Sequence, residues 1–154
     1  MKIALIGYGK MGKAIEKIAI SSHHIISHKL EKDNSIDSLI NNKPDIAIEF
    51  TQPESVFENV TFCLENHIPI ITGTTGWNDK LSQARALCLE RKGTFLFASN
   101  FSVGVNLFFE LNKWLAEKTK NLNFSPKLHE IHHTEKKDSP SGTAITLAEG
   151  IIDS

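Results

Sequence analysis

Short apolar runs and helical repeats of apolar residues alternate along most of the chain. Continuous apolar runs of four to six residues are typical of buried parallel strands, and apolar residues three or four positions apart are typical of helices. The pattern predicts strands at residues 3–6, 25–30, 45–50, 69–72 and 94–98. It predicts helices at residues 11–19, 35–41, 51–66, 78–92 and 105–119.

Five βα units in succession predict an α/β fold, a Rossmann-type doubly wound parallel sheet with right-handed crossovers. A polar break at 121–126 follows, and beyond it the pattern predicts a strand at 127–133 and a helix at 143–152. We therefore expect a dinucleotide-binding domain at 1–122 and the beginning of a smaller α+β substrate domain at 123–154. A segment of about 30 residues is too short to bury a core alone, so we expect this second domain to be truncated.

The first predicted strand leads directly into the glycine-rich turn Gly7-Tyr8-Gly9-Lys10-Met11-Gly12 and then a helix. The spacing G-x-G-x-x-G between a strand and a helix is typical of a site for a dinucleotide pyrophosphate. Gly7 permits the tight turn, Gly9 lets the pyrophosphate approach the backbone, and Gly12 lets the helix pack on the strand. A glycine-rich turn without a ligand is the alternative, and the strand–turn–helix context disfavours it.

The dinucleotide pattern also requires an acidic residue about 20 positions further on, which holds the adenosine ribose. Glu31 fits this position, and Asp33 is its competitor. Lys29 and Lys32 flank Glu31, and a cation here can accept a 2′-phosphate, so NADH and NADPH both stay open. Taken singly, each of these residues fits a solvated charged loop equally well.

Three more turns with small or polar residues follow predicted strands, at Phe50-Thr51, at 73–76 and at 98–101. Ligands of doubly wound sheets bind beyond the carboxyl ends of the strands, where these turns meet. Each turn alone is also compatible with a plain connection. Together they predict one ligand-binding rim.

A histidine pair, His132 and His133, precedes Lys136 by a few residues, and Gly142-Thr143 then opens an apolar helix. Histidine titrates near neutral pH, lysine adds a compact positive charge, and helix N-termini favour anions. This combination predicts proton transfer beside an anion site. A polar surface strand and loop is the alternative.

The same region contains His129-Glu130-Ile131-His132-His133, which matches the zinc pattern H-E-x-x-H. That pattern binds zinc only on a helix, where residues four apart share a face. Pro126 and Pro140 flank the segment closely and favour a strand instead. In a strand Glu130 and His132 share one face, and the zinc geometry is lost. We therefore predict no metal site.

Bulk properties narrow the functional classes. The chain has 154 residues, 40% of them apolar, and a net charge of -1, which gives no reason to expect nucleic acid or an acidic membrane as partner. No apolar run approaches the length of a membrane span, and the start of the chain lacks the pattern of a signal peptide. Cys63 and Cys88 lie in helical patterns and are expected to be reduced. We expect a cytoplasmic protein.

The residues from Glu130 to Ala144 carry the pattern E-x-H-H-x-x-K-x-D-x-P-S-G-T-A. This segment resembles the signature of 4-hydroxy-tetrahydrodipicolinate reductase, an enzyme of the diaminopimelate route to lysine. The resemblance extends through the glycine-rich turn at residues 7–12, the turn at 73–76 and the segment 98–106, and it covers nearly the whole chain.

The resemblance implies reduction of a small cyclic dicarboxylate with NADH or NADPH to form tetrahydrodipicolinate. It implies His132 as general acid or base, Lys136 as proton donor, and His133, Gly142 and Thr143 as substrate-binding residues. It also implies a set of cofactor-binding residues: Gly7, Tyr8, Gly9, Lys10, Met11, Gly12, Glu31, Gly73, Thr74, Thr75, Ala98, Ser99, Asn100 and Phe101.

Members of this family are longer than the present chain, and the resemblance implies a homotetramer for the full-length form. Two other functions compete with the reductase. One is a non-catalytic dinucleotide-binding regulatory module, which leaves the histidine–lysine group without a purpose. The other is a different small-molecule reductase on the same fold.

Overall fold

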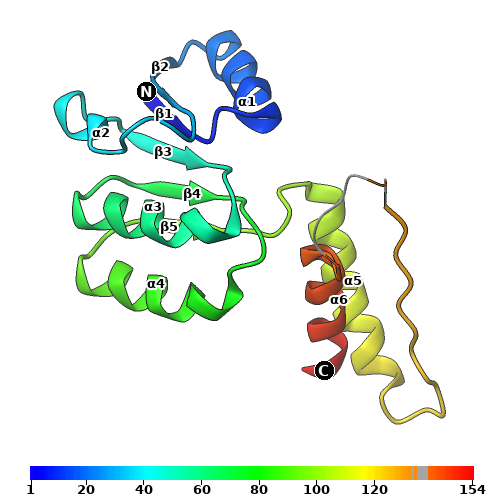
Figure 1. Ribbon diagram of the computed structural model, residues 1–154. Coiled ribbons are helices and arrows are strands. Elements are labelled where there is room, and N and C mark those ends of the chain that lie inside the picture. Colours follow the sequence, from blue (N-terminus) through cyan, green and yellow to red (C-terminus); the bar gives the residue numbers. More distant parts are fainter. Residues whose placement is uncertain (133, 135–138) are drawn as a thin grey trace. The chain divides into compact units, whose positions relative to one another are not determined.

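The computed structural model describes residues 1–132, 134 and 139–154 (Figure 1). The strands are β1 (Lys2–Ile6), β2 (Ile25–Leu30), β3 (Ile46–Glu49), β4 (Ile70–Thr72) and β5 (Phe95–Phe97). The helices are α1 (Lys10–Ser21), α2 (Ser38–Asn41), α3 (Pro53–Glu65), α4 (Asn78–Glu90), α5 (Val103–Thr119) and α6 (Gly142–Ile152). The chain forms two compact units, Met1–Ala98 and Ser99–Ser154.

All five strands pair in parallel in the order β2-β1-β3-β4-β5, which confirms the predicted doubly wound sheet. The strand order reverses between β1 and β3, and ligands of such sheets bind at this reversal. The register aligns Leu30, Ile6, Glu49, Thr72 and Phe97 across the sheet at the ends of the five strands. The turns that follow these residues therefore share one edge.

The sheet of the first unit has an apolar core on each face. On one face, Val56, Val60 and Leu64 of α3 are fully buried with Leu39 of α2 and Ala84 of α4. The other core combines Ile3 and Leu5 of β1 with Ala19 of α1. Figure 1 shows α3 and α4 side by side along the sheet. This two-faced burial explains why the central strand β1 is an apolar run that does not alternate with polar residues.

The start of α3 follows the sequence closely, while the end of α4 differs from expectation. Pro53 occupies the first turn of α3, where its missing N–H costs nothing. The apolar pattern had predicted that this helix extends to residue 92. In the structure α4 ends at Glu90, and Lys92 adopts the left-handed conformation with φ of 50°.

The second unit contains α5, an extended segment and α6, and Figure 1 shows the two helices side by side. Asn112 of α5 donates a hydrogen bond of 2.9 Å to the Leu147 carbonyl of α6. A Cβ on Gly150 would lie 3.1 Å from the Lys113 side chain, so the helices approach closely there. Because α5 packs on α6, the compact units divide after Ala98. The sequence had placed the division between residues 122 and 123.

The strand expected at residues 127–133 is wrong for 127–132, which form neither strand nor helix. Residue 133 lies outside the described residues. A strand requires a paired neighbour, and the described part of the second unit offers only helices and irregular chain.

Burial predicts which leucines stabilise the first unit. Leu64 is fully buried and Leu89 is 80% exposed. We expect Leu64→Ala to lower the free energy of unfolding by about 2–5 kcal/mol, because it leaves a cavity in the core. Leu89→Ala, the matched control, should change it by about 0.5 kcal/mol or less. Urea unfolding measures both, and equal losses would contradict the assigned core.

Candidate dinucleotide site and acid–base cluster

Two glycines of the turn after β1 occupy positions that exclude a side chain. Gly7 has φ of 92°, and a Cβ on it would lie 2.0 Å from the Phe50 carbonyl oxygen. A Cβ on Gly12 would lie 2.5 Å from the Gly7 carbonyl oxygen. Gly9 differs, because a Cβ there would meet no atom within 4 Å in the described part of the chain. The space above Gly9 is thus open to a ligand.

A cleft of about 810 Å³ lies beside this turn, within the first unit. Its lining combines the glycine-rich turn, the end of β2 and the turn after β3, including Gly9, Glu31, Lys32 and Thr51. The Gly7 and Tyr8 amides both donate to the Leu30 carbonyl, so they hold the turn against β2. The amides of Met11 and Gly12 lie in the first turn of α1, where backbone N–H groups lack an intrahelical partner and favour anions.

The charged residues predicted near the adenosine ribose lie in two different places in the structure. Glu31 and Lys32 line the cleft. Lys29 instead contacts Glu16, with 2.5 Å between Lys29 Nζ and Glu16 Oε1. Tyr8 donates its hydroxyl hydrogen to Glu16 as well, and Lys29 lies 5.2 Å from the Tyr8 ring centre. Of the two lysines considered for a 2′-phosphate, only Lys32 is among the lining residues.

The Tyr8–Glu16–Lys29 group shifts three pKa values in consistent directions. The hydrogen bond from Lys29, followed by that from Tyr8, lowers the pKa of Glu16. The same contacts raise the pKa of Lys29 and of Tyr8, chiefly through their hydrogen bonds to Glu16. Sequence reasoning missed Glu16, because its position beside Tyr8 depends on how α1 packs.

The turn after β4 adjoins the turn after β3 on the same edge of the sheet. A Cβ on Gly73 would lie 2.1 Å from the Phe50 ring. The Thr51 amide donates a hydrogen bond of 2.8 Å to Thr74 Oγ1, and the Thr74 hydroxyl contacts Glu49. The Thr74 side chain therefore faces the protein interior, which leaves the backbone of this turn and Thr75 to meet a ligand.

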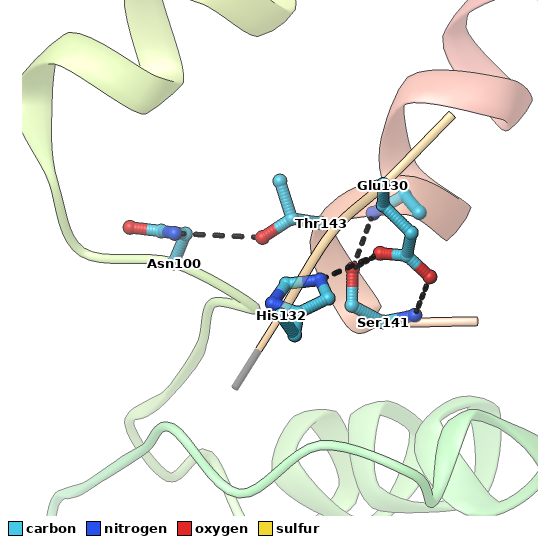
Figure 2. Close-up of polar contacts among 6 residues, drawn as sticks. Asn100, Glu130, His132, Ser141 and Thr143 are labelled. Carbon is cyan, nitrogen blue, oxygen red and sulfur yellow. Dashed lines mark hydrogen bonds and ion pairs between the residues drawn. The ribbon is translucent and has the colours of Figure 1, made fainter. Parts of the chain in front are cut away.

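The predicted cofactor segment 98–101 is divided between the two units. Ala98 belongs to the first unit, where its amide donates to the Thr72 carbonyl. In the second unit, the Ser99 and Thr146 hydroxyls lie 3.1 Å apart. Asn100 donates to Thr143 Oγ1 at 3.5 Å (Figure 2). Asn100 and Thr143, which were expected to contact different ligands, are thus neighbours.

Figure 2 shows the main polar cluster of the second unit, which centres on Glu130. His132 Nε2 lies 2.8 Å from one Glu130 carboxylate oxygen. Ser141 donates to the same carboxylate twice, through its amide at 3.0 Å and its hydroxyl at 2.5 Å. Ser141 also caps α6 by accepting a hydrogen bond from the Ala144 amide. Glu130 therefore links the histidine to the start of α6, at Gly142 and Thr143.

Three hydrogen bonds lower the pKa of Glu130 to about 2, in the order Ser141 hydroxyl, His132 and Ser141 amide. Each bond favours the ionised carboxylate. An ionised carboxylate accepts the hydrogen of His132 Nε2 and so orients the ring. Glu130 was absent from the expected site residues, although its spacing of two from His132 placed both on one face of an extended chain.

The other predicted residues of this region, His133 and Lys136, lie outside the described residues. Residues 129–132 are not helical, and His133, the second histidine of the H-E-x-x-H match, is among the residues outside the description. In the part of the chain that the structure describes, no group of three or more His, Cys, Asp or Glu side chains is placed to hold a metal ion. Within the same residues, no helix is long and apolar enough to cross a membrane.

A parallel doubly wound sheet with a glycine-rich turn and a cleft at the strand-order reversal defines a dinucleotide-binding α/β protein. The family model for the N-terminus of dihydrodipicolinate reductase matches residues 1–101, and the model for its C-terminus matches residues 104–154. The chain belongs to the dihydrodipicolinate reductase family, whose members use NAD(P)H.

Similar proteins agree with this assignment. The 4-hydroxy-tetrahydrodipicolinate reductase of Christiangramia forsetii is 47% identical over 99% of this chain and 64% of the relative. That of Corynebacterium urealyticum is 33% identical over 98% of this chain and 61% of the relative. The chain thus spans less than two thirds of the length of these relatives.

Solved structures show the same fold. The dipicolinate-bound dihydrodipicolinate reductase of Paenisporosarcina sp. TG-14 superposes with a TM-score of 0.75 at 28% identity, over 99% of this chain and 66% of that one. The WlbA dehydrogenase of Chromobacterium violaceum, in complex with NADH and UDP-GlcNAcA, has a TM-score of 0.59 at 15% identity, over 77% of this chain and 40% of that one. The second likeness concerns the fold alone.

The Glu130 cluster predicts a measurable titration. Because the pKa of Glu130 in the folded chain is about 2, below its ordinary value, its ionised form stabilises the fold above pH 4.5. That contribution is lost as the pH falls from about 4.5 to about 2. We expect Ser141→Ala to raise the pKa of Glu130, because the strongest hydrogen bond is removed. NMR titration of the Glu130 side chain measures this pKa.

The matched control for this titration is Ser139→Ala, at an exposed serine two residues away. It should leave the pKa of Glu130 unchanged. An ordinary pKa for Glu130 in the unaltered chain, or the same pKa in Ser141→Ala, would contradict the cluster.

Proposed function

We propose that this chain supplies the cofactor site and the acid–base group of an NAD(P)H-dependent reduction of 4-hydroxy-tetrahydrodipicolinate to tetrahydrodipicolinate, in lysine biosynthesis. The substrate gains a hydride and loses its 4-hydroxyl group, which takes up a proton and leaves as water. The observation that carries the proposal is the Glu130 cluster. It joins His132 to the N-terminus of α6 within one compact unit. An acid–base group and an anion site are what reduction of an unsaturated dicarboxylate requires.

The first unit holds the dinucleotide in this proposal. The first turn of α1 offers amides to the pyrophosphate, and Gly9 leaves room for its approach. Glu31 accepts hydrogen bonds from the adenosine ribose, and Lys32 stands beside it on the cleft wall, able to meet a 2′-phosphate. The backbone at Gly73–Thr75 faces the nicotinamide side. The bound nicotinamide supplies a hydride.

The second unit binds the substrate carboxylates at the start of α6. Gly142 and Thr143 occupy the first helical positions, where backbone amides and the helix dipole favour an anion. Dipicolinate, a cyclic dicarboxylate, is bound in the related structure from Paenisporosarcina. His133 is assigned the second carboxylate.

Proton transfer is assigned to His132 and Lys136. The hydrogen bond between His132 Nε2 and Glu130 fixes the ring and leaves Nδ1 to exchange a proton with the substrate or solvent. Glu130 holds the His132 ring through this hydrogen bond, so Glu130 acts as a positioning residue for the histidine. Lys136 donates the proton that follows hydride transfer.

In its full-length form we propose a cytoplasmic homotetramer. Light scattering of a chain with the relatives' full length measures the assembly.

A non-catalytic dinucleotide-binding module remains the competing function. Binding of pyridine-2,6-dicarboxylate distinguishes the two functions, because a reductase requires a site for a dicarboxylate and a regulatory module does not. Failure of this analogue to bind the NADH-loaded full-length protein would favour the regulatory function.

The assigned proton-transfer residues are tested in a chain extended to the relatives' full length. We expect His132→Ala and Lys136→Ala each to lower turnover by about 100-fold or more, while NADH still binds, because neither residue lies in the first unit. His129→Ala, at an exposed histidine of the same segment, is the control and should retain activity. Steady-state kinetics decide the outcome, and near-normal turnover in both variants would refute the assignment.

The dinucleotide site has its own test in the glycine-rich turn. Gly9→Ala places a methyl group where no protein atom lies within 4 Å in the described structure, so the stability of the fold should change by less than about 1 kcal/mol. That methyl group meets the pyrophosphate instead, and NADH affinity should fall on the order of tenfold or more.

Calorimetry measures the affinity of this variant, and Gly104→Ala on α5 is the matched control. Its new Cβ would lie 3.8 Å from the nearest atom, Ser102 Oγ. Unchanged NADH affinity in Gly9→Ala would contradict the proposal that the pyrophosphate binds at this turn.

A further inference from the structure

Glu49, the last residue of β3, is a fully buried carboxylate that none of the proposed chemistry uses. It lies at the carboxyl edge of the sheet, paired in register with Ile6 on one side and Thr72 on the other. A buried charge is costly unless hydrogen bonds satisfy it. The hydrogen-bond partners of Glu49 therefore indicate its structural role.

The contacts of Glu49 come from two turns of the rim. From the turn after β3, the Thr51 amide donates at 3.0 Å, and the Thr51 hydroxyl donates as well. From the end of β4, the Thr72 hydroxyl donates to the other carboxylate oxygen. The Thr74 hydroxyl lies 3.0 and 2.9 Å from the two oxygens. The carboxylate thus ties the β3 turn to the β4 turn.

The donors and acceptors of this network match one another. Thr74 Oγ1 accepts from the Thr51 amide while its hydrogen points to Glu49, and Thr72 Oγ1 likewise accepts from the Thr74 amide. A carboxylate can accept all these hydrogens because it only accepts. A glutamine has nearly the same shape, but its NH₂ group would face hydroxyl donors.

This network borders both glycine turns of the candidate cofactor site. Phe50 lies between Glu49 and Thr51, its carbonyl fills the space beside Gly7, and its ring fills the space beside Gly73. Thr51 lines the cleft. The position of residues 50 and 51 therefore sets the spacing between the turn after β1 and the turn after β4.

We propose that Glu49 is a positioning residue for the dinucleotide, which holds the turn for the pyrophosphate and the turn for the nicotinamide at the spacing that one cofactor spans. This inference rests on the proposed function, since it requires a dinucleotide that contacts both turns. Ligands that reach only the turn after β1 do not depend on this spacing.

The test compares two ligands on the 154-residue chain, NADH and ADP, by calorimetry. ADP contains the adenosine and the pyrophosphate but lacks the nicotinamide half. We expect Glu49→Gln to weaken NADH binding by about tenfold and ADP binding by less than about twofold. Glu49→Asp, which keeps an acceptor-only group, should recover part of the NADH affinity.

The matched control is Thr61→Val, since Thr61 Oγ1 is buried without a hydrogen-bond partner in the described structure. It should bind both ligands as the unaltered chain does. Thr72→Val removes one donor to Glu49 and should show the same selective loss at smaller size. Circular dichroism establishes whether Glu49→Gln folds. If it does not, the comparison of NADH and ADP binding in Thr72→Val tests the inference instead.

Equal losses for NADH and ADP in the folded variants would reduce Glu49 to a purely structural residue. Unchanged binding of both would also overturn the inference. If the unaltered chain fails to bind NADH at all, the proposed cofactor site itself fails, and this outcome is distinct from the other two.

Discussion

The close approach of the β3 turn to two glycines is the constraint on which the candidate cofactor site depends. The Phe50 carbonyl lies against Gly7 and the Phe50 ring lies against Gly73. A Cβ at either glycine would clash with Phe50. The three turns on the edge are therefore packed as one piece. The open position in this rim is Gly9, where the described chain leaves room for a ligand.

Two carboxylates, Glu49 and Glu130, accept several hydrogen bonds each but position different parts of the chain. Glu49 is buried under the rim and accepts from threonines, so it acts on the backbone of the turns. Glu130 is half-buried and accepts from His132 and Ser141, so it positions an imidazole ring and a helix start. In both cases a carboxylate with several donors fixes the groups that we propose to contact the ligand.

The sequence predicted the first unit well, because local signals and tertiary packing agree there. Apolar runs gave all five strands, and the strand–turn–helix context of Gly7 to Gly12 located the cleft. It failed where spatial neighbours decide. The segment 127–132 has strand-like residues but no paired strand in the described second unit.

The contacts of individual side chains were the least predictable part. Lys29 had the charge for a 2′-phosphate, yet it contacts Glu16 through the packing of α1. The polar end of an otherwise apolar strand, Glu49, was a visible signal, but its meaning depends on β4 being the neighbour of β3. The spacing of Glu130 and His132 already placed them on one face of an extended chain, but the hydrogen bonds of Glu130 to His132 and Ser141 are visible only in the structure.

The most direct test of the account is a ¹⁵N NMR titration of this chain with NADH, followed by pyridine-2,6-dicarboxylate. NADH should shift the backbone amides of Gly9, Met11, Gly12 and Gly73–Thr75. The dicarboxylate should then shift those of Gly142 and Thr143. Absence of NADH-induced shifts at both glycine turns, with shifts elsewhere or none, would contradict the dinucleotide site on which the proposed reduction depends.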